Sequence, residues 1–159
     1  MTDKQFRNKT KKRKKTILQT VKDLISKITP KKGEYIEAIG RRKTAIARVR
    51  LYPAKKNEIF VNGKKNDEFF GTDELVKKTT EALVDITEKY LITVFVKGSG
   101  FNAQAEAIRL GVSRALVKID ENLRFSLKAK GFLKRDPRSV ERKKPGLKKA
   151  RKAPTWVKR

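Results

Sequence analysis

The sequence predicts a single small α/β (α+β) domain, in which a four-stranded mixed sheet is backed by two helices and extended basic tails lie at both ends. Short segments in which apolar and polar residues alternate are typical of half-buried strands. Two longer segments repeat their apolar residues at three- and four-residue steps, which is typical of helices. The chain also carries 43 Lys and Arg against 17 Asp and Glu, with the excess gathered outside its middle. These three observations predict the fold class and the tails.

The first element expected is a short amphipathic helix that follows a basic run. Apolar residues recur from Ile17 to Ile28 at helical spacing, and Thr29-Pro30 ends the pattern. A helix of about a dozen residues is marginal in isolation, so we expect it to dock on a partner. Residues 1–33 are therefore predicted to be a basic N-terminal extension.

The globular domain is predicted to span residues 34–127. Strands are expected at 35–40, 44–52, 58–61 and 91–96, and helices at about 73–88 and 102–118. In the second strand, small and branched apolar residues alternate with Ile46, Arg48 and Arg50, so one face is core and the other largely cationic. Segment 91–96 is almost wholly apolar, which predicts the central strand. A short strand or turn at about 124–127 leads into the tail, residues 128–159.

The charge is distributed unevenly. Residues 1–33 have a net charge of +10, residues 34–123 of +3 and residues 124–159 of +13. A segment as basic as the C-terminal one has too little apolar surface to pack on itself. A partner with negative charge along its length is needed to order it, and a polyphosphate backbone fits best. The sequence therefore predicts nucleic-acid binding.

The composition excludes several other classes. Cysteine and histidine are absent, which excludes thiol chemistry, histidine acid–base chemistry and ordinary zinc sites. The acidic residues of segment 73–88 are expected to form a solvent-exposed helix face, since no nucleophile or base accompanies them. We predict no enzyme, catalytic residue, cofactor, metal site or small-molecule substrate. No apolar run nears the roughly 20 residues that cross a bilayer, so neither a membrane nor a secreted location is expected. A cytoplasmic protein is favoured over an organellar one.

Two groups of cations are candidate phosphate ligands. Arg41, Arg42 and Lys43 follow Gly40 at a strand connection and would form a phosphate clamp, the alternative being a solvated basic turn. Arg109 and Arg114 on the second helix either reach RNA or lie along the surface of the helix. The tail supplies the strongest signal, with Asp136 and Glu141 expected to pair with neighbouring Arg and define turns. Its cations are Arg135, Arg138, Arg142, Lys143, Lys144, Lys148, Lys149, Arg151, Lys152, Lys158 and Arg159.

The amino-acid sequences of three segments indicate a protein family more specifically than their charge does. The tail matches RDPR-x-VERKK-x-G-x-KKAR-x-x-P-x-x-x-KR over Arg135 to Arg159. Gly40 to Val49 matches G-R-R-K-x-x-x-A-R-V, and Gly100 to Leu116 matches G-x-x-x-Q-A-x-A-I-R-x-G-x-x-R-A-L. With three motifs in order, residues 34–159 resemble the bacterial form of the universal S-nine family, the ninth protein of the small ribosomal subunit.

This resemblance implies a structural protein of the ribosome, similar in fold to the second domain of the S-five ribosomal protein. Its partners would be the small-subunit ribosomal RNA, neighbouring proteins of the subunit head and the P-site tRNA. Lys158 and Arg159 would face the anticodon stem-loop of that tRNA. Ribosomal RNA would be met by Arg41, Arg42, Lys43, Arg135, Arg138, Arg142, Lys143, Lys144, Lys148, Lys149, Arg151 and Lys152. Residues 1–33 are an extension beyond the family's usual start, and Trp156 is a candidate for stacking on a base or ribose.

Competing functions remain open at this point. A free-standing RNA-binding regulator or chaperone would use the same tails and bind many RNAs with steep salt dependence. A solvated tail or a localisation signal accounts for the charge alone. An enzyme of RNA metabolism lacks an acid–base or metal constellation. The three motifs favour the ribosomal reading.

Overall fold

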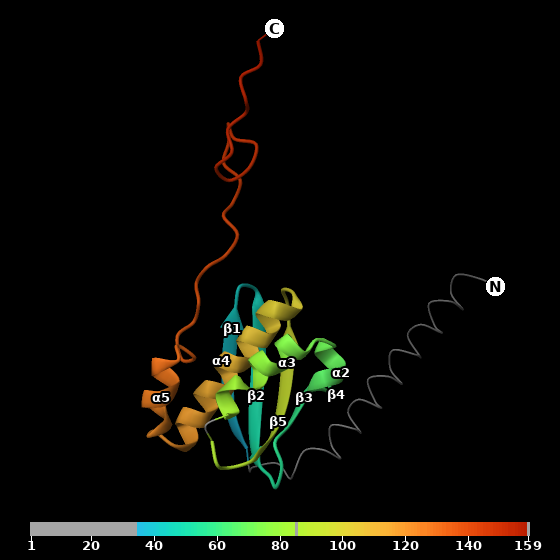
Figure 1. Cartoon of the computed structure of the whole chain (residues 1–159), viewed down its shortest axis with the longest axis vertical. Coiled ribbons are helices and arrows are strands. Elements are labelled where there is room, and N and C mark those ends of the chain that lie inside the picture. The colour runs from blue at the N-terminus through green and yellow to red at the C-terminus, as the bar shows by residue number, and fades with distance from the viewer. Residues whose placement is uncertain (1–34, 85, 159) are drawn as a thin grey trace, which may run out of the picture.

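The computed structural model describes residues 35–84 and 86–158 (Figure 1). The expected helix at 17–28 lies outside the described residues. The strands are β1 (Ile36–Arg42), β2 (Ala45–Pro53), β3 (Glu58–Val61), β4 (Lys64–Lys65) and β5 (Tyr90–Lys97). The helices are α2 (Asn66–Phe70), α3 (Asp73–Thr80), the 3-10 turn η1 (Glu81–Leu83), α4 (Phe101–Ile119) and α5 (Leu123–Ala129).

The strands form one mixed sheet in the order β1-β2-β5-β3-β4. β1 pairs with β2 and β2 with β5 in antiparallel fashion, whereas β3 runs parallel to β5. The parallel pair needs a crossover, which α2, α3 and η1 provide. The predicted mixed sheet and the central place of segment 91–96 are confirmed, and the two-residue β4 adds a fifth strand at the edge.

The helices cover one face of the sheet, with α4 lying across β1 and β2 (Figure 1). The residues of α4 that repeat at three- and four-residue steps are buried, namely Ala107, Ile108, Gly111, Ala115 and Leu116. On the sheet side, the buried residues of β2 are those of the predicted alternation, Ala45, Ala47, Val49 and Leu51. The apolar residues of the alternating strand and of the helix therefore form a single core.

Two glycines bring α4 very close to the sheet. A Cβ atom on Gly40 would lie 1.8 Å from the carbonyl oxygen of Ala107 and 2.6 Å from the amide nitrogen of Gly111. A Cβ atom on Gly111 would lie 2.6 Å from a methyl group of Val49. Neither position has room for a side chain, so Gly40 serves helix–sheet packing in addition to starting the basic motif.

One predicted helix ends earlier than expected, and one predicted strand or turn is wrong. The helix expected at 73–88 ends at Thr80 and continues only as η1, because the Thr79 and Thr80 hydroxyls donate back to the carbonyl of Val76 and compete with helix hydrogen bonds. The strand or turn expected at 124–127 is the helix α5, whose Leu127 is buried against the core.

The tail begins where packing on the domain ends. Phe132 and Leu133 are the last residues partly buried against the core, and the Phe132 amide donates to the Leu127 carbonyl at 3.0 Å. From there to residue 158 the chain forms neither helix nor strand and runs away from the domain (Figure 1, orange to red). The cations of the tail are thus carried outside the folded body.

Candidate nucleic-acid interface

The cations of the first basic motif point in different directions. Arg41 is exposed on the face of the sheet that the helices leave open, and Lys43 is exposed in the turn between β1 and β2 with a positive φ of 49°. The side chain of Arg42 is only 11% exposed and lies on the other side of the strand. Strand alternation separates neighbours in this way, so the motif does not form one three-cation clamp.

Arg42 joins three parts of the chain that are distant in sequence. Its Nε donates to Oε2 of Glu106 on α4 at 2.5 Å, and its Nη2 lies 2.9 Å from Oδ2 of Asp136 at the start of the tail. Its Nη1 donates to the backbone carbonyls of Asp136 and Arg138. Since a guanidinium offers five donors in a fixed fork, one side chain can hold helix, strand and tail together. Arg42 therefore fixes the root of the tail.

Other expected RNA ligands have partners within the protein. Arg109 Nη1 lies 2.5 Å from Oε2 of Glu81, and its guanidinium stacks over the ring of Phe132 with 4.7 Å to the ring centroid. Arg114 donates to the carbonyl of Ile39 at 3.0 Å, and Arg135 donates to that of Lys43 at 3.5 Å. These contacts tie α4, the sheet and the tail root to one another.

The tail contains a closed loop. Glu141 accepts from Arg151 at 2.8 Å and pairs with Lys144 at 2.8 Å, and the amide of Lys148 donates to the carbonyl of Lys152 at 2.7 Å. The expected pairing with a neighbouring Arg is confirmed for Asp136, which accepts from Arg138, whereas the Arg partner of Glu141 is Arg151, ten residues further along the chain. Hydrogen bonds from Arg138 lower the pKa of Asp136 to about 2, and those from Lys144 and Arg151 lower the pKa of Glu141.

The remaining tail cations lie at the surface. Arg142, Lys143, Lys148, Lys149, Lys152 and Lys158 are all exposed. Trp156 is 83% exposed, so the indole of this residue is accessible for stacking. Arg159 lies outside the described residues. The surface available to a polyanion is therefore concentrated beyond the tail root.

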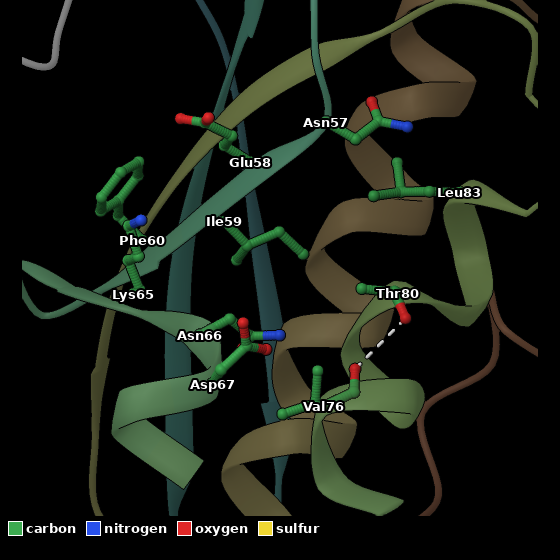
Figure 2. A pocket seen from close by; sticks show the side chains of 10 residues that line it. All are labelled: Asn57, Glu58, Ile59, Phe60, Lys65, Asn66, Asp67, Val76, Thr80 and Leu83. Carbon is green, nitrogen blue, oxygen red and sulfur yellow. Dashed lines mark hydrogen bonds between the residues drawn. The ribbon is translucent and has the colours of Figure 1, made fainter. Parts of the chain in front are cut away.

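A pocket of about 240 Å³ lies beside α2 and α3 (Figure 2). Its polar groups include the carboxylates of Glu58 and Asp67 and the amide of Asn66, which donates to Thr79 Oγ1 at 2.7 Å. The two carboxylates outnumber Lys65, the one cation among the lining residues, so a phosphate is disfavoured here. In residues 35–84 and 86–158 no three His, Cys, Asp or Glu side chains gather to hold a metal ion, and no helix there is long and apolar enough to cross a membrane.

Sequence reasoning missed the exposed aromatic residue of the sheet. Phe95 is 63% exposed on the central strand β5, on the face that carries Arg48. Because most residues of β5 are apolar, no alternation marks Phe95 as a side chain that points to solvent. Phe95 is exposed because the helices cover only the other face of the sheet, and that placement depends on the topology.

The role of Arg42 can be tested by its replacement with methionine. Arg42→Met keeps the length of the side chain but leaves the Glu106 and Asp136 carboxylates without their shared partner. We expect the tail root to lose about 1–3 kcal/mol of local stability, measured as faster amide hydrogen exchange at residues 134–139. Arg41→Met is the matched control and should leave this exchange unchanged. Equal effects of the two variants would contradict a specific anchor.

Comparison with known families agrees with this geometry. The family model described as ribosomal protein S9/S16 matches residues 40–159, which includes Gly40 of the close approach to α4, the Arg42 anchor and the whole tail. Members are ribosomal proteins of the small subunit that bind ribosomal RNA and take part in translation. The chain therefore belongs to the ribosomal protein S9/S16 family and is a structural, ribosomal-RNA-binding component of the ribosome.

Proposed function

We propose that the folded domain sits on ribosomal RNA in the head of the small subunit and that the tail extends from it to the anticodon stem-loop of the P-site tRNA. The observation that carries the proposal is a tail that leaves the domain from an anchored root and has exposed cations along its length. Lys158 and Arg159 would contact the tRNA. Neighbouring head proteins are the proposed partners of residues 1–33.

The length of the tail suits this role. From Lys134 to Lys158 an extended chain spans at most about 80 Å, at roughly 3.3 Å per residue. Exposed charges act mainly within a Debye length of about 8 Å at physiological salt. Cations must therefore be carried physically to a distant phosphate, and a tail that projects from the domain does so.

The proposed RNA ligands divide into two groups. Arg41, Lys43, Arg114, Arg135 and the exposed tail cations would contact phosphates directly. Arg42, Arg109, Arg138, Lys144 and Arg151 pair with carboxylates inside the protein, so their part is to hold the others in place. The function is that of a scaffold without catalysis, located in the ribosome.

The tRNA contact is tested by replacing Lys158 and Arg159 together with alanine. We expect the affinity of purified small subunits for P-site tRNA to fall about tenfold, or roughly 1.4 kcal/mol, while the chain still enters the subunit. The matched control is the double variant Lys55→Ala and Lys56→Ala, in the β2–β3 loop at the far end of the domain. Trp156→Ala should also weaken retention if its ring stacks. Unchanged tRNA affinity in the tail variant, or an equal loss in the control, would refute the contact.

A further inference from the structure

The face of the sheet that the helices leave open has a regular arrangement of side chains. One row across three strands consists of Ile39, Arg48 and Phe95, which are directly paired. The next row consists of Arg41, Ile46 and Lys97. All six residues are exposed. Since paired residues on adjacent strands lie about 5 Å apart, the two rows form one continuous surface of mixed apolar and cationic groups.

The charge of this open face is positive. A third row adds Arg50 and an acidic residue, Glu37, which are directly paired. That carboxylate lies 3.0 Å from Nε of Arg50 and 3.8 Å from Nε of Arg48, so Arg50 neutralises most of its charge. Arg41, Arg48 and Lys97 surround the apolar residues without a carboxylate in their own two rows. A polyanion complements this pattern, whereas the centre of a protein–protein interface is depleted in charge.

The aromatic ring at the centre of the open face narrows the choice of polyanion. Phe95 is the most exposed apolar residue of the sheet, and Arg48 stands beside it on the neighbouring strand. Bases stack on exposed aromatic rings only where they are unpaired, because a duplex keeps its base faces covered. A sheet face with an exposed aromatic ring flanked by cations is an arrangement that suits single-stranded RNA.

The open face also lies next to the root of the tail, with strand β1 between them. Arg41 directly precedes the anchor Arg42, and Arg135 donates to the carbonyl of Lys43 in the adjoining turn. The cations of the open face and those of the tail root therefore lie on either side of strand β1.

We propose that the open face of the sheet binds unpaired nucleotides of RNA, with one base stacked on Phe95 and the neighbouring phosphates held by Arg41, Arg48 and Lys97. The proposal rests on the RNA-binding function of the chain but not on the tRNA contact. It assigns to the folded domain a mode of recognition that differs from phosphate binding by the tail.

The first test compares two variants of Phe95 in the full-length chain. The probe is a single-stranded RNA of about a dozen nucleotides, set against a duplex of equal length. Phe95→Leu removes the ring and should weaken single-strand binding about tenfold with little effect on the duplex, whereas Phe95→Tyr should bind as the natural chain does. Phe125→Leu, on the exposed Phe125 of α5, is the matched control. Equal losses for Phe95→Leu and Phe125→Leu, or equal losses on both RNAs, would overturn the proposal.

The second test uses assembled small subunits. A photoreactive phenylalanine analogue at position 95 should crosslink to ribosomal RNA at an unpaired nucleotide, and at position 125 it should not give that product. Crosslinking of position 95 to a protein, including another part of this chain, would overturn the proposal. Subunits with Phe95→Leu should keep their affinity for P-site tRNA, so a failure here is distinguishable from a failure of the tail contact.

Discussion

Gly40→Ala should lower the free energy of unfolding of the domain by about 3 kcal/mol or more. The new methyl group would lie 1.8 Å from the carbonyl oxygen of Ala107, so strand β1 and helix α4 must move apart. That separation would loosen the packing around Gly111 and Val49, which are both fully buried in the natural chain. For a domain of this size the loss corresponds to a fall in melting temperature of roughly 10–20 °C.

Thermal unfolding followed by circular dichroism measures this effect. Gly100→Ala is the control, because a Cβ atom on Gly100 meets nothing within 4 Å and its φ of −99° suits alanine. That variant should lose no more than about 1 kcal/mol, the cost of alanine in place of glycine at the N-cap of α4. A Gly40→Ala variant as stable as Gly100→Ala would show that α4 does not pack as closely on the sheet as described.

Removal of residues 135–159 should have the largest effect on RNA binding. The deleted segment holds eleven cations, of which Arg138, Lys144 and Arg151 pair with its two carboxylates. If the other eight each neutralise one phosphate, the slope of log K against log salt becomes shallower by about 6, at roughly 0.7 per phosphate on a single strand. Affinity at moderate salt should fall by several orders of magnitude.

Titration of a single-stranded RNA at several salt concentrations measures the slope. Deletion of residues 157–159 alone serves as the matched control and should change the slope by only about 1.4, since it removes two cations. Thermal unfolding of the domain should be nearly unaffected by either deletion, because packing on the core ends at Leu133. A slope unchanged by the long deletion would place the main electrostatic contact on the domain or on residues 1–33.

Much of the fold could be predicted because local patterns and tertiary packing agree. The alternation in β2 and the helical spacing in α4 both place their apolar residues where the core lies. The prediction failed for α5, because a short segment such as 124–127 alternates like a strand. Its helical state depends on packing of Leu127 against the domain, which the segment itself does not encode.

The candidate site was also predicted only in part. Charge alone located the tail and its exposed cations. The partners of Arg42 are Glu106 and Asp136, which stand 64 and 94 residues further along the chain, so no local pattern relates them. The same applies to Phe95, whose exposure depends on which face of the sheet the helices cover. Long-range contacts therefore decide which cations anchor the tail and which remain available.

The anchor at Arg42 also fixes the direction in which the tail leaves the domain. Once RNA holds the tail extended, a rotation of about 10° at the root of an arm up to 80 Å long would displace its tip by roughly 14 Å. That displacement exceeds the Debye length of about 8 Å, within which the terminal cations attract a phosphate. The contacts of Arg42 with helix, strand and tail therefore limit how far the terminal cations can be displaced from their phosphate. A small change of angle at the root would become a large displacement at the end of the tail.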